Sequence, residues 1–283
     1  MTKIAILGGT GYTALELLKI LLRHPAAEIV AVTSRQEGDI AVAESHPSLA
    51  GRIELRMEAF DPDSLVKRGV ECVFGCLPHG ASAAAIAPLL ERGMRVVDLS
   101  ADYRLRNPGV FAKYYGEPPH DPANLAHAVY GLPELYRDKI RAARLVANPG
   151  CYPQTGILGL APLIANRLVD LHSLIVDSKS GVSGAGRTPK LTTHFPECNE
   201  SVTAYSVGNH RHTPEIEQAL SDVAKEPVEV IFTPHLIPMD RGIFTSIYAS
   251  PLAALPDETA LLQLYRDYYK SAPFVRNAAS GDA

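Results

Sequence analysis

The sequence predicts an α/β fold with two domains, a parallel-sheet domain over residues 1–150 and an α+β domain over residues 151–283. Apolar strand-like runs alternate with helical patterns up to about residue 150, and this alternation is typical of a parallel sheet with helices on both faces. Beyond that point one long apolar helix is followed by spaced strand-like runs. The 283 residues, 46% of them hydrophobic, can fill two cores.

The individual elements follow from the spacing of apolar residues and from the glycines and prolines between them. In the first domain we expect helices at 13–22 and 81–92, and strands at 3–7, 28–33, 72–76, 95–99 and 144–147. In the second we expect helices at 155–168, 214–224 and 257–270, and strands at 173–178, 202–207, 228–233 and 243–249. Residues 107–124 contain four prolines and predict an ordered surface excursion.

A glycine-rich turn joins the first strand to the first helix, with the spacing Gly8-x-x-Gly11-x-x-Ala14. This is a variant of the dinucleotide-binding fingerprint, in which Gly11 lets the backbone approach a pyrophosphate and Ala14 allows close packing of helix on strand. An ordinary tight turn is the simpler interpretation, but the strand that follows the helix favours a nucleotide site. The expected cofactor-binding residues of this turn are Gly8, Thr10, Gly11, Tyr12 and Thr13.

The end of the second strand, Thr33-Ser34-Arg35-Gln36, indicates which dinucleotide binds. An acidic residue there would accept hydrogen bonds from the ribose hydroxyls of NAD. The hydroxyl of Ser34 and the guanidinium of Arg35 instead suit a 2′-phosphate, so the predicted cofactor is NADP. The alternative is that Arg35 is a solvated surface residue.

Cys151 is the candidate nucleophile. It follows Asn148-Pro149-Gly150 and precedes an apolar helical run, so it lies at or just before a helix N-terminus. Unpaired N–H groups and the helix dipole there favour thiolate over thiol, and Gly150 leaves the approach to sulfur free of a side chain. The alternative is a small buried hydrophobic residue.

Candidate bases lie in the segment His210-Arg211-His212-Thr213-Pro214-Glu215. In an extended chain His210 and His212 would face the same way. Thr213 is the expected N-cap of a helix, which places Glu215 within one turn of His212, where it could orient the imidazole and raise its basicity. Alternatively, Glu215 is only a favourable first-turn charge.

The net charge of −4 gives no basic footprint for nucleic acid. The chain contains no run long enough for a transmembrane span and enters a strand at once, so we expect a cytoplasmic protein without membrane association. Cys72 and Cys76 are separated by three residues with no second pair, so no metal site is expected. Cations around Arg187 and His210, together with the loop that begins Ser180-Gly181, could hold an anionic substrate.

The chain also resembles a known family through a series of motifs in order and spacing. The match runs to about Arg276 and rests on Gly8-Gly9-Thr10-Gly11-Tyr12, Thr33-Ser34-Arg35-Gln36, Leu77-Pro78-His79-Gly80, Asp98-Leu99-Ser100-Ala101-Asp102-Tyr103-Arg104, Tyr130-Gly131-Leu132-Pro133-Glu134-Leu135, Asn148-Pro149-Gly150-Cys151-Tyr152-Pro153, Lys179-Ser180-Gly181-Val182-Ser183-Gly184-Ala185-Gly186-Arg187 and His210-Arg211-His212-Thr213-Pro214-Glu215-Ile216. Together they are similar to the N-acetyl-γ-glutamyl-phosphate reductases of arginine biosynthesis, in the semialdehyde dehydrogenase superfamily. Aspartate-semialdehyde dehydrogenases share the fold and the cysteine chemistry but not this set.

The resemblance implies a Rossmann-type domain that binds NADP and a catalytic and dimerisation domain. It implies NADPH-dependent reduction of an acyl phosphate to N-acetylglutamate 5-semialdehyde with release of phosphate, through a thioester on Cys151, with His212 as acid and base and Glu215 as its partner. Further cofactor contacts are expected at Leu77 and Pro78. Substrate contacts are expected at His210, Arg104, Ser180, Gly181 and Arg187, and the protein is expected to form a homodimer or homotetramer.

Family members continue beyond the point where this chain ends, so the resemblance also implies a second domain that is truncated at its C-terminus, with an exposed sheet edge. Two other functions stay open on the sequence. A cysteine hydrolase or acyltransferase would use Cys151 and His212 without needing the glycine-rich turn. A catalytically impaired chain could still bind a nucleotide or a partner.

Overall fold

The computed structural model describes residues 1–35 and 39–278. The chain divides into two compact units. Unit 1 comprises Met1–Gly131, Asp138–Pro149 and Gly186–Thr188, and unit 2 comprises Leu132–Arg137, Gly150–Ala185 and Pro189–Ala283. Gln36 of the predicted cofactor motif lies outside the described residues. Within the described part, no helix has the length and apolar character of a membrane span.

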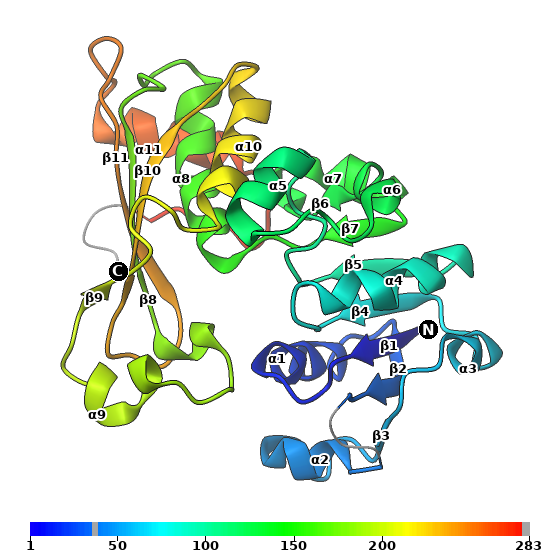
Figure 1. Ribbon diagram of the computed structural model, residues 1–283. Coiled ribbons are helices and arrows are strands. Elements are labelled where there is room, and N and C mark those ends of the chain that lie inside the picture. The colour runs from blue at the N-terminus through cyan, green and yellow to red at the C-terminus, as the bar shows by residue number, and fades with distance from the viewer. Residues whose placement is uncertain (36–38, 279–283) are drawn as a thin grey trace. The chain divides into compact units, whose positions relative to one another are not determined.

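Unit 1 contains a parallel sheet of seven strands in the order β3-β2-β1-β4-β5-β7-β6 (Figure 1). The strands are β1 (Thr2–Leu7), β2 (Ala27–Thr33), β3 (Met57–Glu58), β4 (Cys72–Gly75), β5 (Arg95–Asp98), β6 (Val129–Tyr130) and β7 (Leu145–Ala147). The helices are α1 (Tyr12–Leu21), α2 (Val42–Ser45), α3 (Pro62–Lys67), α4 (Ala81–Glu91), α5 (Pro108–Tyr115), α6 (Pro122–Leu125) and α7 (Pro133–Ala142), whose first residues belong to unit 2. The predicted parallel sheet is confirmed, and residues 107–124 contain two short helices.

Alternation along the strands builds two cores, one on each face of this sheet. In β1, Ile4 and Ile6 pack with Leu18 of α1 on one face, whereas Ala5 and Leu7 pack with Ile86 of α4 on the other. A central strand buried on both faces must be apolar throughout, which is why the first strand could be recognised from its sequence. The short elements β3, α2 and α6 were missed because they carry too few residues to show a period.

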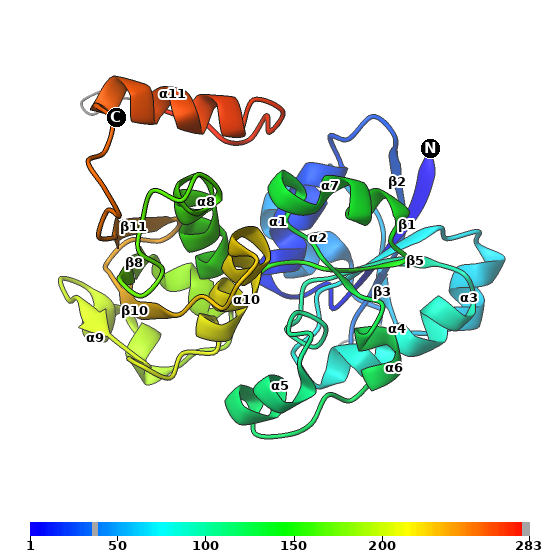
Figure 2. The ribbon, with the colours of Figure 1, turned by 90° about the horizontal axis from the view of Figure 1, so that it is seen from above.

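Unit 2 contains a sheet of four strands in the order β11-β8-β10-β9. The strands are β8 (Leu174–Ser180), β9 (Thr203–Ala204), β10 (Val230–Leu236) and β11 (Ile243–Tyr248), and the helices of four or more residues are α8 (Cys151–Ala165), α9 (Phe195–Cys198), α10 (Thr213–Ala224) and α11 (Glu258–Tyr268). Strands β8 and β10 are parallel, while β11 and β9 are antiparallel to their neighbours. Helices α8 and α10 pack against the sheet, and α11 packs against α8 (Figure 2).

Several predicted boundaries in unit 2 were wrong, and two of them have a clear physical reason. The strand expected at 202–207 is only the two residues of β9, because the chain turns at Ser206, which has a φ of 47°. The helix expected from Thr155 begins at Cys151, since Pro153 in its first turn needs no N–H partner and has a φ that suits a helix.

Candidate active site

Cys151 is the first residue of α8, and Gly150 is the N-cap. Its side chain is exposed, unlike the buried Tyr152 that follows. No side chain caps this helix end. The first-turn N–H groups and the positive end of the helix dipole therefore lie next to Cys151, which is the position at which reactive thiols are commonly found.

The imidazole of His212 lies directly against Gly150. A Cβ built on Gly150 would be 2.5 Å from Nε2 of His212 and 2.9 Å from two ring carbons. Such distances are far inside van der Waals contact, so only glycine leaves room for the ring. Gly150, the residue that precedes Cys151, thus gives the imidazole its place.

Glu215 holds the backbone of the same residue. Its side chain is 1% exposed, and Oε1 accepts a hydrogen bond of 2.6 Å from the N–H of Gly150. The carboxylate therefore joins the first turn of α10 to the N-cap of α8. The predicted role of Glu215 in orienting His212 stays a prediction.

A turn, not an extended chain, brings His210 and His212 together. The N–H of Thr213 donates to the carbonyl of His210 at 3.0 Å, and the two rings are 4.8 Å apart between centroids. The N-cap of α10 is His212, so the prediction of Thr213 as N-cap was wrong by one residue. A histidine at the N-cap lies where the chain turns, which directs its ring toward Gly150.

His210 is a neutral imidazole at ordinary pH. Burial, followed by the nearby charges of His212 and Arg211, lowers its pKa from 6.5 to about 3. Its Nδ1 accepts a hydrogen bond of 3.0 Å from the N–H of His212, which assigns the remaining proton to Nε2. His210 can therefore offer an N–H donor but no positive charge.

Two tyrosines beside the histidines were not predicted. The hydroxyls of Tyr152 and Tyr205 are 2.9 Å apart, and both rings make edge contacts with His210. The ring of Phe232 lies 5.2 Å from that of His210. These apolar surroundings explain the low pKa of His210. In the sequence, the only indication of this cluster was that a tyrosine, Tyr152, immediately follows the candidate nucleophile.

Ser180 and Gly181 lie at the end of β8, where the backbones of two segments meet. A Cβ on Gly181 would be 2.6 Å from the carbonyl oxygen of Asp240, and the N–H of Gly181 donates to Gly242 at 3.0 Å. The hydroxyl of Ser180 donates to the carbonyl of Gly181 at 3.0 Å. These contacts fix the loop that follows the strand. The predicted substrate contacts of both residues stay predictions.

In unit 1 the glycine-rich turn has the geometry of an anion site. Gly8 has a φ of +79°, and a Cβ there would be 2.6 Å from the carbonyl oxygen of Cys76. A Cβ on Gly11 would meet nothing within 4 Å, and Gly11 is the N-cap of α1, which has no side-chain cap and no acidic residue in its first turn. Open N–H groups at such a helix end suit a pyrophosphate. Thr10, Tyr12 and Thr13 lie at this helix start.

Other predicted cofactor residues lie at the carboxyl ends of β2 and β4, the two strands that flank β1. Ser34 is buried after β2, where its N–H donates to the carbonyl of Glu58 at 3.0 Å, and Arg35 is exposed. Leu77 and Pro78 follow β4, which is paired with β1. Ligands of open α/β sheets bind outside the carboxyl ends of the strands.

Arg104, predicted as a substrate contact, bonds to two backbone carbonyls of unit 1. It is 8% exposed, and it donates 2.8 Å hydrogen bonds to the carbonyls of Asn148 and Leu99. It therefore ties the segment before Cys151 to the loop after β5. The predicted contact of Arg104 with substrate stays a prediction.

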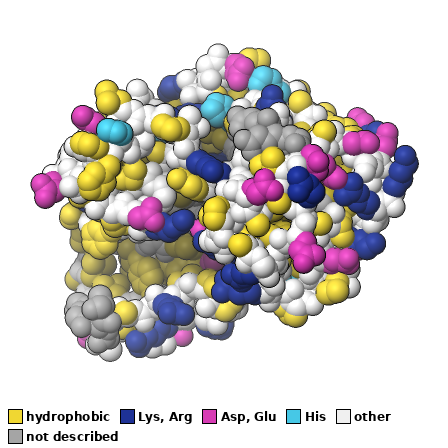
Figure 3. All heavy atoms as spheres, turned by 90° about the horizontal axis from the view of Figure 1, so that it is seen from below, with side chains coloured by type: hydrophobic (Ala, Val, Ile, Leu, Met, Phe, Trp, Pro, Cys, Tyr) yellow, Lys and Arg dark blue, Asp and Glu magenta, His cyan; other side chains and the backbone are white. Residues whose placement is uncertain are grey.

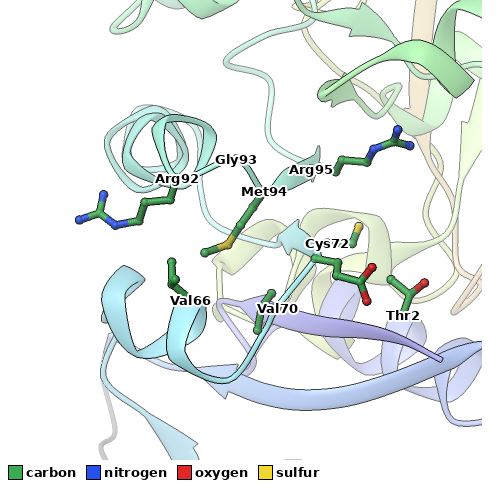
Figure 4. Close-up of a pocket in the computed structure, with 9 residues that line it drawn as sticks. Thr2, Val66, Val70, Cys72, Arg92, Gly93, Met94 and Arg95 are labelled. Atoms are coloured by element: carbon green, nitrogen blue, oxygen red, sulfur yellow. The ribbon is translucent and has the colours of Figure 1, made fainter.

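A separate hollow of about 690 Å³ lies at the amino ends of β1, β4 and β5. Figure 4 shows Arg92 and Arg95 extending in opposite directions from it. Arg92 is bound to Asp63 at 2.7 Å, and Arg95 contacts the carbonyl of Arg141. The hollow lies at the amino ends of the strands, whereas the glycine-rich turn lies at the carboxyl end of β1. Its two arginines extend away from each other and not toward a common point (Figure 4).

Comparisons with family models and with solved structures show the general class of this protein. Family models of the semialdehyde dehydrogenase, NAD binding domain and of the semialdehyde dehydrogenase, dimerisation domain match residues 3–143 and 151–283. An aspartate semialdehyde dehydrogenase II from Vibrio cholerae superposes with a TM-score of 0.67 at 15% identity, over 100% of this chain and 84% of that one. An aspartate semialdehyde dehydrogenase with NADP from Candida albicans gives 0.64 at 14%, over 95% and 76%. The chain thus has the semialdehyde dehydrogenase fold and a domain that binds a nicotinamide cofactor.

Curated relatives narrow the class. N-acetyl-gamma-glutamyl-phosphate reductases from Rhodopirellula baltica and Acidithiobacillus ferrooxidans are 48% and 50% identical over 277 and 275 residues, covering 96% and 97% of this chain. The chain spans 80% and 79% of their lengths. The enzyme of that name from Geobacter metallireducens is 47% identical over 100% of this chain and 81% of its own length. The chain belongs to the N-acetyl-gamma-glutamyl-phosphate reductase family.

The expectation of a truncated second domain is not supported. The dimerisation-domain model matches through residue 283, and the relatives cover nearly the whole chain. The described residues of unit 2 build their own core, with Ile157, Leu160, Val176, Ile216 and Phe232 all buried. The greater length of family members therefore does not show that this domain lacks part of its core.

Charged side chains of both signs mix on one face of the molecule (Figure 3). On the face drawn in Figure 3, lysine and arginine side chains are interspersed with aspartate and glutamate. Such mixing agrees with the small net charge of −4. It gives no continuous basic field on that face of the kind that binds a phosphate backbone.

Proposed function

We propose that the chain catalyses the NADPH-dependent reduction of N-acetyl-γ-glutamyl phosphate to N-acetylglutamate 5-semialdehyde and phosphate. Membership of the family named for this reaction supports the substrate. The observation that carries the chemistry is an exposed Cys151 at an uncapped helix start, with His212 packed on Gly150. A hydrolase or a binding protein would have no need of both this arrangement and a dinucleotide-binding domain.

In the first step the Cys151 thiolate attacks the acyl carbon, the bond from that carbon to the phosphate oxygen breaks, and phosphate leaves. First-turn N–H groups of α8 stabilise the oxyanion, an interaction worth about 3 kcal/mol per donor in well-studied enzymes. When bound, NADPH supplies the hydride that reduces the resulting thioester. After this reduction His212 donates a proton to the oxygen that was the carbonyl oxygen of the thioester. It takes the proton back as the carbon–sulfur bond breaks and the aldehyde and the thiolate separate.

Residues of both units support Cys151 and His212. Glu215 fixes the N-cap of the nucleophile's helix through the Gly150 N–H, and we propose that it also orients His212. His210 offers the substrate an uncharged Nε2–H. Ser180 and Gly181 form a rigid loop with which the substrate makes contact, and Arg104 acts on the Asn148 carbonyl ahead of the nucleophile.

The residues of unit 1 fit a dinucleotide, because Gly8 permits the tight turn and the space at Gly11 leaves the start of α1 open. We propose Thr10, Tyr12, Thr13, Leu77 and Pro78 as further contacts. Ser34 and Arg35, in place of an acidic residue after β2, support NADP as the cofactor.

The proposed functional domains are residues 1–150 for the cofactor and 151–283 for catalysis and assembly. We propose a homodimer or homotetramer that uses the face of the four-stranded sheet turned away from α8 and α10. Ile231, Phe244 and Tyr248 on that face are 64%, 65% and 57% exposed. The free thiols of the four cysteines support a cytoplasmic location.

The test runs the reaction in reverse, with N-acetylglutamate semialdehyde and NADP, with and without phosphate, on wild type and Cys151→Ser. We expect phosphate-dependent formation of NADPH that the serine variant loses. Because serine preserves the size of the side chain, a matching melting temperature shows that chemistry alone is removed. Turnover without phosphate, or turnover that survives in the variant, would exclude the acyl-phosphate mechanism.

A further inference from the structure

Arg187 lies on the glycine-rich turn of unit 1. Gly186–Thr188 belong to that unit, although the residues on either side belong to unit 2. Nη1 of Arg187 donates to the carbonyl of Thr10 at 2.9 Å, and to the carbonyl and Oγ of Ser45 at 3.3 Å and 3.2 Å. One nitrogen of the guanidinium thus fastens it to the turn.

The other edge of the guanidinium remains available. Within the described residues, Nε and Nη2 of Arg187 make no hydrogen bond and no carboxylate pairs with the side chain, which is exposed. Nε–H and Nη2–H are parallel donors whose spacing matches two oxygens of a phosphoryl group. Because Nη1 is already held, little side-chain entropy is lost when this fork binds.

The surroundings favour an anion. Gly11 starts α1 without a side-chain cap, and no acidic residue lies in the first turn of that helix. His46, which contacts the carbonyl of Gly9 at 2.6 Å, has a pKa lowered first by burial and then also by the positive charges of Arg187 and Lys19. A phosphoryl group here would meet N–H donors, a helix dipole and a guanidinium together.

We propose that Arg187 binds a phosphoryl group of the dinucleotide at the Gly8–Tyr12 turn and not the acyl phosphate of the substrate. The inference rests on the proposed function in one respect, that a dinucleotide occupies this turn. It changes the role expected for Arg187 from the sequence, where the neighbouring Ser180-Gly181 loop indicated a substrate contact. It also makes a residue far along the chain from the fingerprint a part of the cofactor site.

The experiment measures binding without turnover, by calorimetric titration of NADPH, NADH and 2′,5′-ADP into wild type, Arg187→Gln and Arg187→Lys. We expect the Kd for NADPH to rise about 10- to 100-fold in the glutamine variant, the effect of losing charge-assisted hydrogen bonds. Lysine keeps the charge without the fork and should lose less. Lys190→Gln removes an exposed cation three residues away and should change nothing.

The three ligands distinguish whether Arg187 binds the pyrophosphate or the 2′-phosphate. Equal weakening of NADH and NADPH assigns Arg187 to the pyrophosphate, whereas weakening of NADPH and 2′,5′-ADP alone assigns it to the 2′-phosphate, and both support the inference. An unchanged Kd in a variant that melts like wild type overturns it, most clearly if the KM for phosphate rises instead. Failure of the wild type to bind any dinucleotide also overturns it. Wild type that binds NADPH without turning over would leave this inference standing and count against the proposed function.

Discussion

At the scale of single residues, the site depends on a glycine, Gly150. Gly150 is the N-cap of α8, the donor to Glu215 and the surface on which His212 lies. The carboxylate of Glu215 and the ring of His212, both from the start of α10, therefore converge on a residue with no side chain of its own. Gly150 leaves room for a histidine ring beside the residue that precedes Cys151.

Replacing Gly150 with alanine should disable the enzyme and leave it folded. The new Cβ would overlap the His212 ring at 2.5 Å, and a ring can rotate away more easily than the backbone can move. A displacement of about 1 Å can cost about 100-fold in kcat. Steady-state kinetics and a thermal melt check this. Gly109→Ala, whose Cβ would meet only the side chain of Asn107 at 3.2 Å, is the matched control, and equal activity in both variants would contradict the argument.

His210 should make stability depend on pH in acid. Its pKa is about 3 in the folded chain against 6.5 for an ordinary histidine, so the unfolded chain binds more protons between these values. The contribution of its neutral form is present above pH 6.5 and is lost as the pH falls toward 3. His210→Asn cannot titrate, so the stability difference between wild type and this variant should shrink on acidification.

Urea unfolding at several pH values between 7 and 4 measures that difference. His172→Asn, at an exposed position, controls for the loss of any histidine. A difference that stays constant with pH would show that His210 does not titrate in the way its burial implies.

At the scale of elements, α11 supports the helix that carries Cys151. Pro162 lies inside α8 and has no N–H to donate to the carbonyl of Leu158, four residues earlier. The hydroxyl of Tyr269 donates to that carbonyl at 2.7 Å, and Tyr265 donates to the next one, of Gly159. Tyr269 therefore compensates for the proline, which explains a polar contact of α8 at this point.

Tyr269→Phe should destabilise the chain by about 1–3 kcal/mol, the cost of leaving a buried carbonyl without a donor. Tyr268→Phe provides the control, because its hydroxyl makes no hydrogen bond among the described residues. Urea denaturation of both variants measures the free energy of unfolding. If the two changes cost the same, the hydroxyl of Tyr269 does not compensate for Pro162.

At the scale of the whole molecule, one face of the four-stranded sheet of unit 2 carries exposed apolar side chains. Strand pairing aligns Tyr248, Ile175 and Ile231 in one row across β11, β8 and β10. Phe244 lies opposite Lys179, one end of an ion pair with Asp177. A flat surface that combines exposed apolar rows with a few charges is typical of an interface between subunits.

A charge placed in that row should therefore weaken assembly. We expect Ile231→Glu to shift the protein toward monomer, because the carboxylate would lose its hydration in the interface. Ile20→Glu, at an isoleucine that is 57% exposed on α1, should leave assembly unchanged. Sedimentation equilibrium distinguishes them. An Ile231→Glu chain that assembles like wild type would place the interface elsewhere.

The sequence by itself determined most of the long elements and the parallel sheet, although not α7, and it singled out the glycine-rich turn as a candidate cofactor site. Buried parallel strands and the helix after Gly11 follow from local composition, since apolar runs and glycine spacing are properties of neighbouring residues. Cys151 could be singled out for the same reason, because a glycine before it and an apolar helix after it are local signals.

Only the tertiary structure decided which distant groups meet. The contacts of His212 with Gly150, of Arg187 with Thr10 and of Tyr269 with Leu158 join segments far apart in the chain. The neutral state of His210 likewise depends on burial among rings from three elements. Hydrogen bonding and desolvation act through space, so no local pattern of residues could have predicted them.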